Sequence, residues 1–178
     1  MTVKEQLLEL IPEFNLIKSS ELREKTMAVW IEALKCGGWN VSDLGEMPFT
    51  LLLKPCPANM IEHVRGVTGC AYEMGKKLKE IYGERLELDM DALVSGALLH
   101  DIGKLLEYKK EGEYKKSEYG SYIRHPFSGM ALAYKFDLPA KVQHIIALHA
   151  KEGEGAKRCP EAIIVHYADF SNFEPFKK

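Results

Sequence analysis

Residues 96–104 read Gly-Ala-Leu-Leu-His-Asp-Ile-Gly-Lys and place the pair His100-Asp101 at the end of a small, apolar run. The residues from Ala92 to Leu99 are almost all apolar, so the helix that they predict is buried on nearly every side. A carboxylate there is costly to bury unless it is paired, hydrogen-bonded or bound to a metal, and histidine is the commonest metal ligand. The pair therefore predicts a metal site at the end of a buried helix.

Four further residues offer the remaining ligands for such a site. His63 lies upstream of the pair, and His125, His149 and Asp169 lie downstream. From His63 through His100 to Asp169, the intervals are 37, 25, 24 and 20 residues. Each interval corresponds to about one helix with its connection. We therefore expect several helices each to bring a ligand to one centre.

Helical patterns surround these residues. Between residues 59 and 82 the apolar residues recur at three-and-four spacing, which predicts a long helix with His63 near its start. Asp89 or Asp91 can cap the helix that carries the His-Asp pair near its end. If that helix continued beyond the pair, the side chain of Lys104 would overhang the pair. Three more helices are expected to open at prolines, namely Pro126, Pro139 and Pro160.

Two other segments have recognisable patterns. The tetrapeptide Glu-Tyr-Lys-Lys occurs at 107–110 and again at 113–116, around Glu111-Gly112, and predicts a small β-hairpin. Near the N-terminus, Ser19-Ser20-Glu21 caps a predicted helix that ends at Gly37-Gly38. The prolines of residues 39–57 predict an irregular crossing. The fold class is therefore all-α, with residues 1–56 as an N-terminal helical appendage on a metal-binding domain of residues 57–178.

Composition limits the environment and the partners of the chain. With 24 Lys plus Arg against 26 Asp plus Glu, the net charge of -2 provides no overall attraction for nucleic acid or an anionic membrane. No run approaches the roughly 20 apolar residues of a membrane span, and the N-terminal apolar stretch is too short and too charged for a signal peptide. The four cysteines lack Cys-x-x-Cys spacing. These features predict a cytoplasmic protein with reduced thiols.

The ordered set His63, His100-Asp101, His125, His149, Asp169 resembles that of the HD-domain metal-dependent phosphohydrolases, in the branch whose pair is followed by Ile-Gly. The resemblance covers residues 57–178 and implies a helical bundle that forms the catalytic domain. It also implies that the first His, the His-Asp pair and the final Asp are metal ligands, and that the two intermediate histidines are added in a dinuclear subset. One position departs from many relatives, because Gly66 stands where they carry an arginine.

The donor set constrains the metal. Four histidines and two aspartates suit Fe, Mn, Co, Ni or Zn, whereas Mg prefers oxygen ligands and is expected only as a weak activator. Asp101 has two oxygens and is the candidate to bridge two ions. One ion would be completed by His63, His100 and Asp169, and the other by His125 and His149.

Two cations are candidates for binding phosphate. Lys104 follows Asp101 by three residues and can hold a phosphate or stabilise a leaving group, which makes it a catalytic candidate together with Asp101. Arg124, next to His125, is the second candidate for binding the substrate. The lysines of the predicted hairpin have glutamate neighbours and are interpreted as solvated.

The resemblance and the residues together predict a phosphohydrolase that acts on a nucleotide or another small phosphate ester through a metal-activated water. Two alternatives remain open at this stage. Some proteins similar to this family use the same six ligands to hold two irons and oxidise a substrate with O2, and a non-catalytic nucleotide-binding sensor would retain the site without turnover. Phosphate release, oxygen uptake and binding without turnover distinguish the three.

Overall fold

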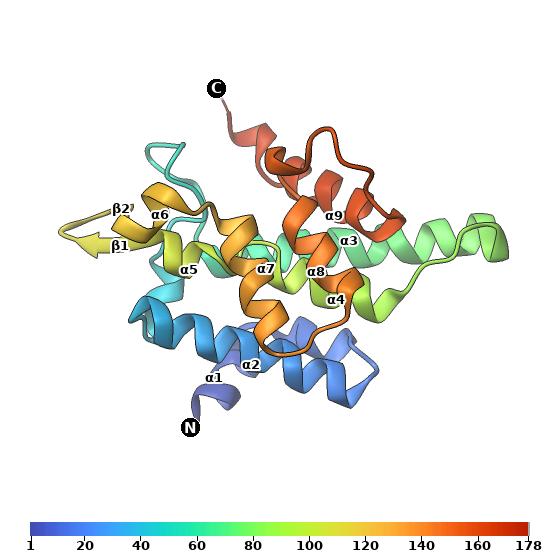
Figure 1. Ribbon diagram of the computed structural model, residues 1–178, viewed down its shortest axis with the longest axis horizontal. Helices are drawn as coiled ribbons and strands as arrows, with labels where there is room; N and C mark the ends of the chain where they lie inside the picture. Colours follow the sequence, from blue (N-terminus) through green and yellow to red (C-terminus); the bar gives the residue numbers. More distant parts are fainter. Residues whose placement is uncertain (178) are drawn as a thin grey trace.

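The protein is described by a computed structural model that covers residues 1–177 and is helical apart from one hairpin (Figure 1). The predicted all-α class with a small β-hairpin is confirmed. The α-helices are α1 (Val3–Leu10), α2 (Ser20–Gly37), α3 (Met60–Tyr82), α4 (Met90–Leu99), α5 (Lys104–Glu107), α6 (Glu118–Tyr122), α7 (His125–Lys135), α8 (Ala140–Leu148) and α9 (Pro160–Ser171). Short 3-10 turns are η1 (Pro12–Leu16), η2 (Val41–Gly45), η3 (Gly83–Arg85), η4 (Lys151–Gly153) and η5 (Glu174–Phe176).

Helix α4 is the centre of the bundle. All its residues from Ala92 to Leu99 are buried, as their apolar character predicts, and it packs against α2, α3, α8 and α9. Asp89 caps the helix by accepting a hydrogen bond from the backbone N–H of Ala92. Asp91, the alternative cap, instead accepts from the backbone N–H groups of Lys18 and Ser19. A central buried helix whose last residue precedes His100 thus positions the candidate site.

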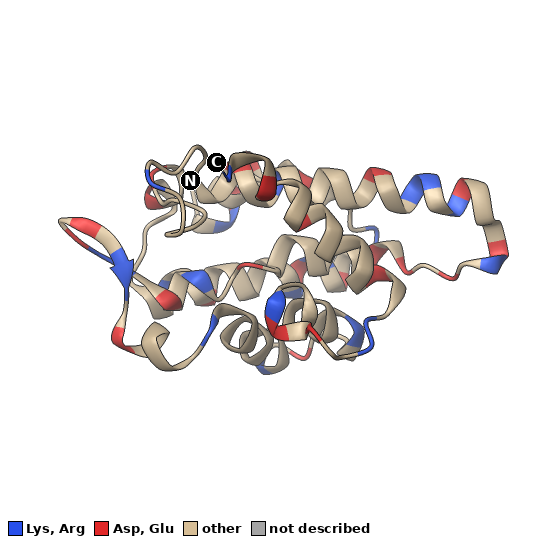
Figure 2. Ribbon diagram, turned by 90° about the horizontal axis from the view of Figure 1, so that it is seen from above, with Lys and Arg blue, Asp and Glu red and all other residues tan. Residues whose placement is uncertain are grey.

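Helix α3 packs beside α4 and carries His63. Asn59 and Glu62 form a capping box at its start, and its apolar stripe faces α4 and α9. His63 lies in the first turn and is buried. The far end of the helix extends beyond its neighbours (Figure 2), and Ile81 and Tyr82 are exposed there.

The N-terminal segment shares its core with the rest of the protein. Helix α2 begins after the cap Ser19, as predicted, and buries Trp30 against α4. The indole N–H of Trp30 donates to the carbonyl of Leu98 at 3.1 Å, and that of Trp39 donates to Leu105 at 2.7 Å. Since side chains on both sides of residue 56 belong to one apolar cluster, the domain boundary remains a prediction.

The hairpin consists of β1 (Tyr108–Glu111) and β2 (Glu113–Lys116), with Tyr108 opposite Lys116 and Glu111 opposite Glu113. Gly112 at the turn has a φ of 76°, a conformation that glycine adopts without steric cost. The arms project from the helical body at the left of Figure 1. None of the helices within residues 1–177 combines the length and apolarity needed to cross a membrane.

Candidate metal centre

The carboxylate of Asp101 lies between two pairs of histidines. Its Oδ2 atom is 3.2 Å from Nε2 of His63 and 3.4 Å from Nε2 of His100. Its Oδ1 atom is 3.2 Å from Nε2 of His125 and 3.7 Å from Nε2 of His149. All five side chains are buried. Each carboxylate oxygen therefore faces its own histidine pair, and each pair forms with Asp101 a group whose donor atoms are close enough to share an ion.

Asp169 adds a second carboxylate to the group formed by His63, His100 and Asp101. It lies near the end of α9, and its Oδ1 atom is 3.2 Å from Nε2 of His63 and 3.9 Å from Nε2 of His100. The structure thus brings together all six residues that the sequence singles out as ligands. Their assignment as ligands is a proposal, taken up below.

The His-Asp pair lies at the end of its helix, as predicted. Helix α4 ends at Leu99, residues 100–103 form a turn, and α5 begins at Lys104, so the helix does not continue unbroken from the pair to Lys104. A close approach accompanies this turn: Gly103 packs directly against the start of α7, where an added Cβ would lie 2.1 Å from the carbonyl O of His125. The turn brings the chain beside α7 and so places Asp101 next to His125.

In their neutral forms, the rings of His100 and His149 direct a nitrogen lone pair toward Asp101. Nδ1 of His100 is 2.6 Å from the carbonyl O of Ala97, and Nδ1 of His149 is 2.7 Å from that of Ile146. A carbonyl only accepts, so Nδ1 is the protonated nitrogen in both neutral rings and Nε2 has the free pair. Lone pairs that face a carboxylate repel unless a cation lies between them. The donor set and its orientation therefore fit a metal ion.

The charges of the centre favour ionised carboxylates. Burial opposes ionisation of Asp101, but the positive charge of Lys104 prevails and holds the pKa of Asp101 well below its ordinary value. Burial also acts on Asp169, where the hydrogen bond with His63 prevails and lowers the pKa to about 2. Burial lowers the pKa of His125 to about 4, so this ring is neutral and able to bind a metal near pH 7.

Lys104 reaches into the centre. Its Nζ atom lies 2.5 Å from Oδ2 of Asp101 and donates to the carbonyl O of Phe49 at 2.6 Å. Burial works against the charge, but the Asp101 carboxylate prevails and raises the pKa of Lys104 above its ordinary value. The ammonium group is therefore permanently charged at neutral pH. The contact with Asp101 was not expected from the sequence.

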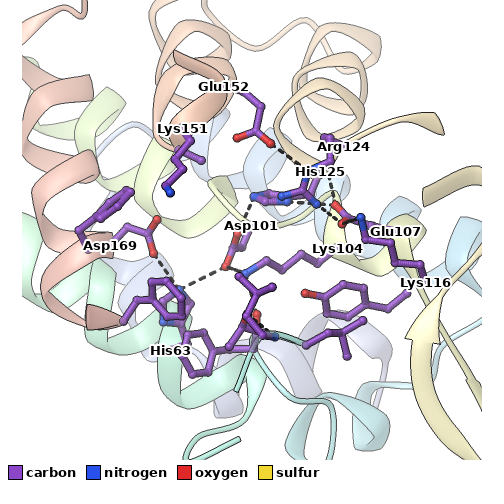
Figure 3. A pocket seen from close by; sticks show the side chains of 18 of the residues that line it. His63, Asp101, Lys104, Glu107, Lys116, Arg124, His125, Lys151, Glu152 and Asp169 are labelled. Atoms are coloured by element: carbon purple, nitrogen blue, oxygen red, sulfur yellow. Dashed lines mark hydrogen bonds and ion pairs between the residues drawn. The ribbon is translucent and has the colours of Figure 1, made fainter. Parts of the chain in front are cut away.

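Arg124 lies at the rim with its charge engaged. Its guanidinium forms ion pairs with Glu107 and, at 2.9 Å, with Glu152 (Figure 3). Lys151, on η4, also lines the cavity and has no ion-pair partner among residues 1–177. Lys151 was not identified from the sequence, because a single lysine in a polar loop has no distinguishing pattern.

Phe49 belongs to the irregular segment whose role the sequence did not indicate. Its ring stacks on the ring of His63, with centroids 4.3 Å apart and planes inclined by 20°. Phe173 packs edge-on against it from the C-terminal side, at 6.0 Å. The first 56 residues therefore contribute a wall of the site as well as core.

A cavity of about 300 Å³ opens beside the candidate ligands (Figure 3). His63, Asp101, His125 and Asp169 line its base, while His100 and His149 lie behind them. One part of the remaining wall is apolar and aromatic and includes Phe49, Leu51, Leu52, Phe170 and Phe173. Another part carries five basic side chains, which are Lys104, Lys116, Arg124, Lys151 and Lys177, together with the acidic Glu107 and Glu152. The cavity is of a size for a small molecule with an apolar portion and negative charge.

A helical bundle that gathers a His-Asp pair, three further histidines and a distant aspartate around one cavity defines an HD-domain protein. The family model of the HD domain matches residues 60–170, and the chain belongs to this family, whose members bind divalent metals. The predicted resemblance and the predicted class, a metal-dependent phosphohydrolase, are confirmed.

Two curated proteins are similar to the chain. The dihydroneopterin 2',3'-cyclic phosphate phosphodiesterase of Methanocaldococcus jannaschii is 32% identical over 179 aligned positions, covering 93% of this chain and 67% of that protein. Ribonuclease Y of Pseudothermotoga lettingae is 32% identical over 93 positions, covering 52% of this chain and 16% of that protein. No solved structure matches the chain significantly.

Proposed function

We propose that this protein is a phosphodiesterase for a small phosphate ester with a planar heterocycle, such as the cyclic phosphate of a pterin or a nucleoside. The similarity to the archaeal pterin phosphodiesterase extends over 93% of the chain, which supports a small-molecule substrate. The match to ribonuclease Y spans only 52% of the chain, and the net charge of -2 gives no general attraction for RNA.

The observation that carries the proposal is the position of Asp101 between two histidine pairs. We assign His63, His100, Asp101 and Asp169 to one divalent ion and Asp101, His125 and His149 to a second. The nitrogen-rich set favours Fe, Mn, Co, Ni or Zn over Mg. Two such ions, when bound, lower the pKa of water and stabilise charge on a phosphoryl group.

Lys104 and Lys151 are the cations best placed to meet the phosphate. Lys104 remains protonated beside Asp101, so it acts as a fixed positive charge toward the phosphoryl oxygens and not as a proton donor. Lys151 faces the cavity from the opposite side (Figure 3). Arg124 is a further candidate for binding the phosphate, but its guanidinium already pairs with the carboxylates of Glu107 and Glu152.

The aromatic wall suits the other end of such a substrate. Phe170 and Phe173 are partly exposed and present apolar surface beside the candidate metal ligands, Phe49 is buried behind this wall, and Leu52 is 80% exposed at the rim. A heterocycle packed there would place its ester phosphate toward Asp101 and Lys104. Hydrolysis then adds one water at phosphorus and breaks one P–O bond, which leaves a phosphomonoester and a free hydroxyl group.

The test combines elemental analysis of the purified protein with a substrate screen. We expect bound transition metal and hydrolysis of a 2',3'-cyclic phosphate of dihydroneopterin or of a nucleoside, both lost in Asp101→Asn. Phosphomonoesters and single-stranded RNA serve as comparison substrates. Oxygen uptake without phosphodiester cleavage, or binding of the cyclic phosphate without turnover under any of the metals, would contradict the proposal.

A further inference from the structure

Three histidines of this centre, His100, His125 and His149, are oriented through Nδ1, the nitrogen that faces away from Asp101. For His100 and His149, the partner of Nδ1 is a backbone carbonyl three residues earlier, at Ala97 and Ile146, near the end of a helix. For His125, the partner is a side chain: Nδ1 is 3.1 Å from Oε2 of Glu107. Glu107 is thus the ionisable residue that takes the place of a helix carbonyl.

The position of His125 explains why a carboxylate is needed. His125 is the first residue of α7, and the preceding Arg124 has extended backbone dihedrals, φ -73° and ψ 149°. Extended residues 123 and 124 separate His125 from the short helix α6, so no helical turn runs into His125 to offer a carbonyl to its ring. Its own backbone N–H is also one of the unpaired donors at a helix start, and it donates to the same Oε2 atom at 2.8 Å. One carboxylate oxygen therefore fixes both the backbone and the ring of His125.

Glu107 is itself held rigidly. Its side chain is 1% exposed, and its other oxygen pairs with Arg124. The backbone N–H of Glu107 donates to Gly103 at 3.0 Å, and its carbonyl accepts from the N–H of Ser117 at 2.8 Å. Gly120 packs so closely on this backbone that an added Cβ would lie 2.3 Å from the carbonyl O of Glu107. Three contacts fix the backbone of Glu107 and the ion pair with Arg124 fixes its carboxylate, so the carboxylate can orient the ring that it contacts.

We propose that Glu107 is a positioning residue that holds His125 with Nδ1 protonated and Nε2 aimed at Oδ1 of Asp101, and so prepares the second metal position. This inference rests on the proposed two-metal function. An outer carboxylate that contacts a ligand histidine typically changes metal affinity by about 10- to 100-fold. We expect the effect at the second metal position only, because Glu107 forms no hydrogen bond or ion pair with the residues assigned to the first metal position.

The competing explanation is that Glu107 serves only to neutralise Arg124 in a buried ion pair. Glu152 provides the matched control, since it pairs with the same guanidinium at 2.9 Å but does not contact His125. A role limited to Arg124 predicts that Glu152→Gln and Glu107→Gln behave alike. A role toward His125 predicts that only the substitution at Glu107 changes the tautomer of His125 and the affinity of the second metal position.

The experiment measures the tautomer of His125 and the binding of Co²⁺. In metal-free wild-type protein, histidine ¹⁵N NMR should show protonated Nδ1 at His125, and Co²⁺ titration should show two bound ions. Glu107→Ala should shift the tautomer population and weaken the second Co²⁺ by about 10- to 100-fold while leaving the first unchanged. Glu107→Gln retains an accepting oxygen without the charge and should weaken the second ion less, and Glu152→Gln should bind as wild type.

Wild-type binding of the second Co²⁺ by Glu107→Ala, with an unchanged His125 tautomer, overturns the proposal. If Glu107→Ala does not fold, wild-type affinity in Glu107→Gln overturns it instead, as does equal weakening by Glu152→Gln. Asp101→Asn separates this inference from the proposed function: if that variant still binds two Co²⁺ ions, the metal assignment itself is wrong. If Asp101→Asn loses both ions but the Glu107 variants bind Co²⁺ as wild type does, only the positioning role of Glu107 is refuted.

Discussion

The Nζ atom of Lys104 lies 2.5 Å from Oδ2 of Asp101, the same oxygen that faces Nε2 of His63 at 3.2 Å. A permanent cation thus shares a carboxylate oxygen with the first proposed metal position. The carboxylate is acceptor-only when ionised and has several lone-pair directions, so one oxygen can serve both partners. Lys104 is therefore held next to the first proposed metal position, where it can act on a phosphate bound there.

We expect Lys104→Ala to retain its bound metal and fold while losing turnover. Ammonium has no lone pair at neutral pH and cannot be a ligand, but it can stabilise charge on the phosphoryl group. The loss should be about 10- to 1000-fold in kcat, in the range of a single oxyanion-stabilising donor. Metal analysis and steady-state kinetics test this, with Lys109→Ala on the hairpin as the control. Loss of metal would show a structural role, and unchanged kinetics would remove Lys104 from the catalytic site.

Lys151 and Arg124 should differ in their effect on substrate binding. Lys151 is exposed on the cavity wall without an ion-pair partner among residues 1–177, whereas Arg124 is paired with Glu107 and Glu152. Lys151→Ala should raise KM for an anionic substrate by about 2- to 5-fold, as for a solvent-screened charge contact, and the effect should diminish with added salt. Arg124→Gln should raise KM less. The reverse order would mean that Arg124 leaves its carboxylates to bind the phosphate.

The helices and the gathering of the candidate ligands follow from local patterns in the sequence. Periodic apolar residues predict α3, and the caps at Asn59 and Asp89 mark where helices begin. The helix-length spacing of the histidines predicts that separate helices converge, and the structure places these histidines around Asp101. These features depend on residues near one another in the chain, so they can be recognised without tertiary contacts.

What the sequence did not indicate depends on contacts between distant segments. Phe49 lies in an irregular, proline-rich stretch, and nothing local shows that its ring stacks on His63. Glu107 belongs to a repeated Glu-Tyr-Lys-Lys pattern that reads as a solvated hairpin, yet its side chain is buried against His125. The turn between His100 and Lys104 depends on a similar distant contact, since Gly103 packs on α7 there.

Glu161 should make the free energy of unfolding depend on pH in the acid range. Its buried carboxylate accepts from the backbone N–H of Asp89 at 2.8 Å and pairs with Lys141 at 3.1 Å, which joins the starts of α4, α8 and α9. Burial opposes its charge, but these contacts prevail and lower its pKa below the ordinary 4.5. A lowered folded-state pKa contributes stability above the unfolded pKa, and the contribution is lost as the pH falls through the folded value.

Glu161→Gln should therefore lower the free energy of unfolding near neutral pH and make its decline below about pH 4.5 shallower. Urea unfolding over a pH series measures both effects. Glu111→Gln is the control, because Glu111 pairs with lysines on the exposed hairpin, where an ion pair contributes little to stability. An acid dependence identical to wild type in Glu161→Gln would show that other carboxylates dominate.

The last prediction concerns Gly103, whose hydrogen side chain allows the turn after Asp101 to touch α7. Its φ of -64° is accessible to any residue, so the requirement for glycine is one of space. A Cβ at this position would lie 2.1 Å from the carbonyl O of His125 and 2.8 Å from the backbone N of Gly129. Neither backbone atom can move without shifting the first turn of α7, and that turn carries the ring of His125.

Gly103→Ala should consequently cost about 1–3 kcal/mol of stability through overpacking and reduce bound metal toward one ion. Gly69→Ala is the matched control, because Gly69 lies within α3 and a Cβ there meets nothing within 4 Å. That change should instead stabilise the helix by up to about 1 kcal/mol and leave the metal content unchanged. Urea unfolding with elemental analysis distinguishes the two. If Gly103→Ala retained wild-type stability and both ions, the contact between the turn and α7 would not be what positions His125.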